Sequence, residues 1–231
     1  FVPSFLHFLA VFSLATAGGF VVVLLLTILT GRLYCSTICP LGILQDVINR
    51  ISRWRSRKKR FFKFKKPHPV LRYVFLGIMT VAVIFGGGWI ATWLDPYSIA
   101  ARTFTYLFKP VVLWTNNAII APALQSMEVY SFYHQSVIQP YILPVILSLA
   151  VIGAIGYFAW KRGRLFCNTI CPVGTLLGEV SRFSFLKVRF DQDKCTRCGK
   201  CAAVCKSECI DIRNYKVDNS RCVTCFNCLD V

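Results

Sequence analysis

The stretch "GRLYCSTICPLG" (residues 31–42) stands at the end of a long apolar run and contains two cysteines four residues apart. The chain repeats it as "GRLFCNTICPVG" at residues 163–174, and nine of the twelve positions are identical. Residues four apart on a helix share a face, so each pair of thiols can point the same way. Two pairs give four cysteines, a number that metal centres commonly use: Cys35, Cys39, Cys167 and Cys171.

The sequence around the two copies is apolar enough to cross a membrane. Of the 231 residues, 55% are hydrophobic, and the mean hydropathy is +0.56. A helix needs about 20 apolar residues to span the bilayer core, and buried core helices are usually shorter. We therefore expect three spanning helices within residues 5–30, 73–94 and 140–160, and a fourth if one precedes Phe1, since the sequence opens without a Met.

The net charge of +17 is concentrated beside these runs. Ten of the seventeen residues from Arg50 to Lys66 are Lys or Arg. Basic residues near span ends mark the cytoplasmic side and attract anionic lipid head groups. This placement favours membrane topology over nucleic-acid binding, so membrane lipid is an expected partner and nucleic acid is not. Residues 95–138 contain only two Lys or Arg and are expected outside, with residues 31–72 and 161–231 inside.

The repeat is longer than the cysteine motif. "LGILQDVINRI" at residues 41–51 has apolar residues at helical spacing, and "VGTLLGEVSRF" at residues 173–183 mirrors it, which predicts amphipathic helices on the inner surface. Each repeat thus comprises a span, the cysteine motif and a surface helix, at an offset of 132 residues. We predict a membrane domain with two parallel repeats over residues 1–184 and a polar, cysteine-rich module over residues 185–231.

The module carries the most specific motif of the chain. "CTRCGKCAAVC" at residues 195–205 has the C-x2-C-x2-C-x3-C spacing of bacterial [4Fe–4S] ferredoxins, whose fourth cysteine binds a second cluster. "CVTCFNC" at residues 222–228 supplies the rest of that second set. We predict two [4Fe–4S] clusters, one held by Cys195, Cys198 and Cys201, and the other held by Cys205, Cys222, Cys225 and Cys228.

Two other interpretations of the module fit less well. Zinc sites favour paired C-x2-C motifs with four ligands, and disulfides are disfavoured on a reducing inner face. The chain stops at Val231, one position before the next cysteine of the pattern, so we expect a truncated module whose remaining ligand lies beyond it. Lys206 replaces the usual Pro after Cys205, and Cys209 is expected to be a buried thiol.

The twin cysteines allow several roles. If the repeats pack as a pseudo-symmetric pair, their four thiolates converge on one centre at the inner membrane surface. That centre could hold a third iron–sulfur cluster, bind another soft metal or act as a redox dithiol, and four buried thiols at helix ends are the structural alternative. Arg32 and Arg164 would offset the charge of such a centre or anchor at lipid phosphates. We favour a shared metal centre.

Twin "GR-L-x-C-x-T-I-C-P-x-G" motifs at span ends, followed by a ferredoxin module, resemble the membrane polyferredoxins. These include the NapH type, the NosR type and the CcoG type. The resemblance implies an electron-transfer subunit of a quinone-linked oxidoreductase complex, with other redox subunits and quinone as partners. It also implies a multi-pass location in the bacterial inner membrane, with the module on the cytoplasmic side. The expected fold is mainly α, with a small α+β bacterial 2[4Fe–4S] ferredoxin module.

A metal-handling protein is the rival function. In that case the twin thiols bind or reduce copper for cofactor assembly, and the ferredoxin module supplies the electrons. A redox sensor is a third hypothesis. No residue stands out as a catalytic acid, base or nucleophile.

Overall fold

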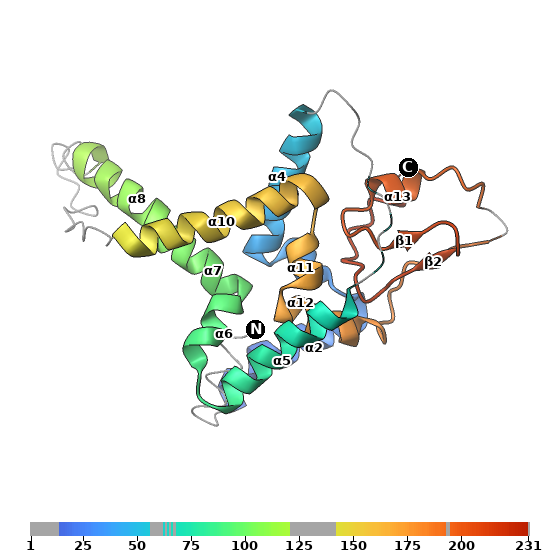
Figure 1. Cartoon of the computed structure of the whole chain (residues 1–231), viewed down its shortest axis with the longest axis horizontal. Coiled ribbons are helices and arrows are strands. Elements are labelled where there is room, and N and C mark those ends of the chain that lie inside the picture. Colours follow the sequence, from blue (N-terminus) through green and yellow to red (C-terminus); the bar gives the residue numbers. More distant parts are fainter. Residues whose placement is uncertain are drawn as a thin grey trace.

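The computed structural model describes residues 14–55, 62, 64, 66, 68–120, 142–192 and 195–230. The chain is mainly helical, and a cysteine-rich ferredoxin region packs at one end of the helices (Figure 1). Three apolar helices overlap the predicted spans: α2 (Leu14–Thr30), α5 (Pro69–Ile84) and α10 (Ile142–Arg162). The second predicted span, residues 73–94, is divided, because α5 ends at Ile84 and a separate helix covers Gly88–Leu94. The start of the first predicted span, residues 5–13, lies outside the described residues.

Only α10, with 21 residues, is both long and apolar enough to cross a membrane among the helices that the structure describes. Helices α2 and α5 are apolar but have 17 and 16 residues. Their ends share one direction: α2 and α10 end at the cysteine motifs, and Arg72 near the start of α5 bonds to Ser220 of the ferredoxin region. The C-terminal ends of α2 and α10 and the N-terminal end of α5 therefore face the ferredoxin region.

The sequence repeat is also a structural repeat. A short helix carries each first cysteine, α3 (Leu33–Thr37) and α11 (Leu165–Thr169), and the two coincide at the offset of 132 residues. A longer helix follows each, α4 (Pro40–Arg55) and α12 (Pro172–Ser181), with the motif proline at its first position. The prediction of a surface helix is wrong for α12, because this helix packs against α2 and α5 and seven of its ten residues are buried. Proline suits this position because its missing N–H would have no intrahelical partner there.

The helix that follows each cysteine motif packs against the other repeat. Helix α4 of the first repeat packs on α10 of the second, and α12 of the second repeat packs on α2 of the first (Figure 1). Helix α5 packs beside α12 and completes the arrangement. This reciprocal packing gives the pair the pseudo-symmetric relation that the sequence predicted, and it places the two cysteine motifs at the centre.

Helix α4 is amphipathic as predicted, but its polar side faces the protein. Gln45, Asn49 and Ser52 are buried against the second repeat, whereas an apolar stripe points outward: Ile43, Val47 and Ile51. Trp54 at the end of the helix is 90% exposed. Leu41 is buried as well, so the inner face of this helix carries both polar and apolar side chains, while apolar side chains are exposed on its outer face.

A run of short helices connects α5 to α10. It comprises α6 (Gly88–Leu94), α7 (Pro96–Thr103), the π-helical turn η1 (Phe104–Phe108), α8 (Lys109–Thr115) and the π-helical turn η2 (Asn116–Ile120). The expected turn at residues 94–98 is the start of α7, where the Asp95 carboxylate accepts from the Ser98 N–H at 2.9 Å. The rest of the predicted outer segment, residues 121–138, lies outside the described residues.

The ferredoxin region contains little regular structure. Helix α13 (Lys200–Val204) and the antiparallel strands β1 (Ile210–Asp211) and β2 (Lys216–Val217) surround a small core. That core is made of Ala202, Cys205, Cys209 and Ile210. Such a small core suits a module whose fold depends on bound clusters, because metal binding supplies folding free energy.

Candidate metal centres

The first glycine of each motif ends the preceding helix. Gly31 and Gly163 have φ values of +74° and +69°, a left-handed conformation that favours glycine. A Cβ at Gly163 would lie 2.6 Å from the carbonyl oxygen of Lys206 in the ferredoxin region. Glycine here therefore both turns the chain and lets the region approach the membrane domain.

The second glycine of each motif allows the helix that follows to touch the cysteine backbone. A Cβ at Gly42 would lie 2.3 Å from the carbonyl oxygen of Cys35, and one at Gly174 would lie 2.2 Å from that of Cys167. Distances this short are not tolerated, so both positions require glycine. The two copies of the motif thus have the same local geometry as well as nearly the same sequence.

Two buried arginines cross between the repeats. Arg32 donates from Nη2 to the carbonyl oxygen of Cys167 at 3.1 Å, and Arg164 donates from Nη1 to that of Cys35 at 2.8 Å. The arginines are 0% and 1% exposed. They do not anchor at lipid phosphates, one of the two roles expected for them. Each instead fixes the cysteine segment of the opposite repeat.

The four motif cysteines lie in one buried cluster, and the shared metal centre expected of them stays a prediction. Cys35, Cys39, Cys167 and Cys171 are 3–6% exposed and belong to the same core. Burial, with a contribution from the nearby Cys39 and Cys35, raises the pKa of the Cys167 thiol to about 12. Thiols in this setting hold their protons, so a bound metal or cluster has to displace them.

The four thiols share one buried core. Within the part of the chain that the structure describes, no three His, Cys, Asp or Glu side chains converge as ligands of one metal ion do. Cysteine thiolates are the ligands that hold iron–sulfur clusters, so the chemistry of this donor set suits such a cluster.

An ion network joins the twin motifs to the ferredoxin region. Arg164 binds both carboxylate oxygens of Asp46 at 2.8 and 2.7 Å, and Lys206 Nζ lies 3.0 Å from Oδ2. Burial opposes ionisation of Asp46, but the hydrogen bond from Arg164 and then that from Lys206 lower its pKa. The lysine that replaces the usual proline after Cys205 thus joins the ferredoxin region to Asp46 of the first repeat, a contact that the sequence did not predict.

A second set of hydrogen bonds joins the helices to the ferredoxin region, at Ser220. Arg32 donates to the carbonyl oxygen of Ser220 at 3.0 Å, and Arg72 donates to the Ser220 hydroxyl at 3.1 Å. Arg72 is 4% exposed, and sequence analysis did not single it out. Its only signal was a lone charge close to a predicted span. The two buried cations hold the loop that leads into Cys222.

Four predicted cluster ligands line one pocket of the ferredoxin region. Cys205, Cys222, Cys225 and Cys228 surround it together with Cys209. Cys209 is fully buried, as predicted, and its Sγ lies 3.5 Å from that of Cys205. The pocket, lined by the four expected thiols from two distant segments, fits the predicted [4Fe–4S] cluster, which supplies one-electron transfer when bound.

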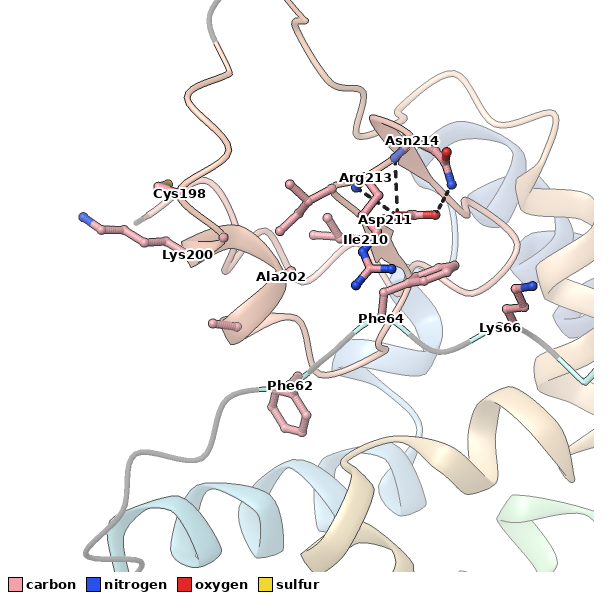
Figure 2. A pocket seen from close by; sticks show the side chains of 13 residues that line it. Phe62, Phe64, Lys66, Cys198, Lys200, Ala202, Ile210, Asp211, Arg213 and Asn214 are labelled. Carbon is pink, nitrogen blue, oxygen red and sulfur yellow. Dashed lines mark hydrogen bonds between the residues drawn. The ribbon is translucent and has the colours of Figure 1, made fainter.

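The other three predicted ligands lie at the outer edge of the region. Cys198 is exposed, and Cys195 and Cys201 are half-buried. Cys198 borders an open groove of about 840 Å³ that Phe62 and Phe64 also line (Figure 2). The three cysteines lie together just before and within α13, as their spacing predicted, and nearer to solvent than the second set.

Comparison with protein families places the same segments among iron–sulfur proteins. A family model described as "4Fe-4S binding domain" matches residues 12–61 and again residues 142–190, which are the two repeats. A second model with that description matches residues 186–207 in the ferredoxin region. Both the membrane repeats and the module are therefore related to 4Fe-4S binding domains.

Three curated relatives share most of the chain. It is 25% identical to the ferredoxin-type protein NapH of Escherichia coli, covering 95% of this chain and 65% of NapH. It is 24% identical to the methylamine utilization ferredoxin-type protein MauN of Paracoccus denitrificans, covering 93% and 62%. YccM of Escherichia coli, named for electron transport, is 23% identical, covering 90% and 50%. The chain thus spans from half to about two thirds of these relatives, and no solved structure matches it.

Proposed function

We propose that the chain is a membrane-bound electron conduit with three iron–sulfur centres. It carries 4Fe-4S binding domains and is a distant homologue of the ferredoxin-type proteins NapH and MauN. Two of the three centres are the [4Fe–4S] clusters of the ferredoxin region. The third is held by Cys35, Cys39, Cys167 and Cys171. It connects the ferredoxin region with the bilayer.

One observation carries this proposal: the twin-cysteine site and the ferredoxin region form one continuous interior. Val223 belongs to the same buried cluster as the four motif cysteines, and Cys225 packs against that cluster. Cys225 is a predicted ligand of the second ferredoxin cluster. The predicted ligands of two centres are thus neighbours in one dry core, which favours passage of electrons between them.

The match of a 4Fe-4S family model to both repeats supports an iron–sulfur cluster at the twin site over copper handling. Helices α2, α5 and α10 are the three proposed spans. They belong to the proposed membrane domain, residues 1–184, and the module comprises residues 185–231. The charge of residues 50–66 supports a cytoplasmic location for the module. The proposed partners are other subunits of a redox complex, quinone and membrane lipid.

The test is the metal content of the purified full-length protein. We expect twelve irons and twelve labile sulfides per chain, because three [4Fe–4S] clusters contain four of each. Cys35→Ala and Cys171→Ala should each remove the same EPR signal, and the double variant should lose no more than either single one. Such non-additivity is typical of residues that act as a unit.

Cys209→Ser is the matched control, since Cys209 is as buried as the motif cysteines but lies in the ferredoxin region. It should leave the twin-site signal unchanged. Eight irons, or additive losses from the two motif variants, would contradict a shared cluster. Either result would favour the rival function, copper handling.

A further inference from the structure

The two halves of the twin-cysteine site differ at one buried position beside the sulfur atoms. Gln45 on α4 is 1% exposed, and its Oε1 lies 3.4 Å from the Sγ of Cys167. Its counterpart 132 residues later is Leu177, which is fully buried in the same core as the four cysteines. One half therefore presents an amide where the other presents a hydrocarbon.

The Gln45 amide has unused hydrogen-bonding capacity. The thiol of Cys167 donates to Oε1, while the buried Nε2 has no hydrogen-bond partner among the residues that the structure describes. Leaving a buried amide N–H without a partner costs about 1–3 kcal/mol in typical proteins. The unpaired donor is thus a feature that the free protein tolerates at a cost, directly beside a predicted cluster ligand.

Binding of iron by the Cys167 sulfur changes the hydrogen bond that this sulfur can make. A thiolate bound to iron carries no proton, so the Cys167 sulfur and the amide oxygen would face each other as two acceptors. Rotating the amide by half a turn exchanges its oxygen and nitrogen. An N–H of Nε2 then donates to the thiolate, and the amide oxygen takes the place that Nε2 held.

We propose that Gln45 is a positioning residue that donates an amide hydrogen bond to the Cys167 thiolate and raises the reduction potential of the twin-site cluster. The inference rests on the proposed function of that site. Hydrogen bonds to the sulfurs of a cluster are among the factors that set its potential, and a donor stabilises the more negative, reduced state. Leu177 offers no donor, so the tuning acts from one repeat alone.

The test replaces Gln45 by the residue found at its counterpart. In the full-length protein, Gln45→Leu should retain its iron and lower the twin-site midpoint potential by about 59 mV, a tenfold change in a one-electron equilibrium. The two ferredoxin clusters should keep their potentials. An exchangeable proton coupled to the reduced twin-site cluster, measured by ENDOR, should disappear. Gln45→Met, unbranched and similar in length, serves if the leucine variant fails to assemble.

Two further variants separate tuning from packing. Asn49→Leu alters a buried amide on the same face of α4, one turn away, that has no described contact with a cysteine, and it should leave the potential unchanged. Leu177→Gln adds a donor to the other repeat and should raise the potential.

A variant at Gln45 that keeps both its potential and its proton coupling would overturn the inference while leaving the cluster in place. An iron count of eight in the unmodified protein would instead overturn the proposed function, so the two failures are distinguishable.

Discussion

At the scale of single residues, Gly174 is the motif glycine that lies against the other repeat. A Cβ at Gly174 would meet the carbonyl oxygen of Cys167 and also Arg32 Nη2, at 2.2 and 2.8 Å. The same atom would therefore disturb the cysteine backbone and the arginine that holds it. Gly42 faces only the first of these conflicts, since its nearest neighbours belong to its own motif.

We expect Gly174→Ala to lower the free energy of unfolding by about 1–3 kcal/mol or more, because overpacking at backbone distance cannot be relieved by a rotamer change. The twin-site EPR signal should be lost at the same time. Thermal unfolding in detergent and iron analysis measure the two effects. Gly153→Ala is the control, since its Cβ would meet nothing within 4 Å. Equal effects of the two substitutions would refute this role of Gly174.

The cysteines of the twin site and the neighbouring Arg32 and Arg164 were predictable from the sequence, whereas other residues that pack beside them were not. The thiols were predictable because the repeat is exact in spacing and the ferredoxin spacing is specific. Gln45 and Asp46 were not, because their counterparts Leu177 and Gly178 differ and a repeat cannot signal positions that it does not share. Contacts such as Arg72 with Ser220 join residues far apart in sequence, which spacing alone does not reveal.

At the scale of elements, helix α4 shows how surroundings change the meaning of an amphipathic pattern. Its helical period was readable from the sequence, and the helix forms where predicted. Which side faces inward was not readable, because a stripe of apolar residues can turn toward a core or toward lipid. Here the second repeat takes the polar stripe, and the apolar stripe is left exposed.

This orientation predicts that α4 lies against the bilayer with Trp54 in the lipid interface, where tryptophan is enriched. In a variant whose other four tryptophans are replaced by Phe, brominated lipid should strongly quench Trp54 fluorescence. Aqueous iodide should quench it weakly. The same variant in lipid-free detergent supplies the reference emission. Strong quenching by iodide and none by brominated lipid would show that the outward face of α4 meets water or another protein.

At the scale of the whole molecule, the ferredoxin region is fastened to the membrane domain at both cysteine motifs. Lys206 and Asp46 hold one side, and Ser220 with Arg32 holds the other. The segment before α5 adds a further contact, since the N–H of Phe62 donates to the carbonyl oxygen of Ala203 at 3.1 Å. Phe62, one of the described residues of the segment 50–66, therefore lies beside the ferredoxin region.

We accordingly expect reporters fused after residue 58 and after the ferredoxin region to be active on the same, cytoplasmic side of the membrane. A reporter fused after residue 118, in the weakly charged outer segment, should be active on the opposite side. Reporter activity in intact cells provides the measurement. Fusions at residue 58 and at the ferredoxin region that respond from opposite sides would refute both the topology and the parallel arrangement of the repeats.

The exchange of arginines between the motifs has the form of a contact between two copies of one chain. Residue 32 meets residue 167 while residue 164 meets residue 35, which is the reciprocal pattern of a two-fold interface within a single polypeptide. The order of the chain has a consequence for assembly. The first motif is synthesised more than a hundred residues before the second, so the bond from Arg32 to the carbonyl oxygen of Cys167 can form only after the second motif has been made.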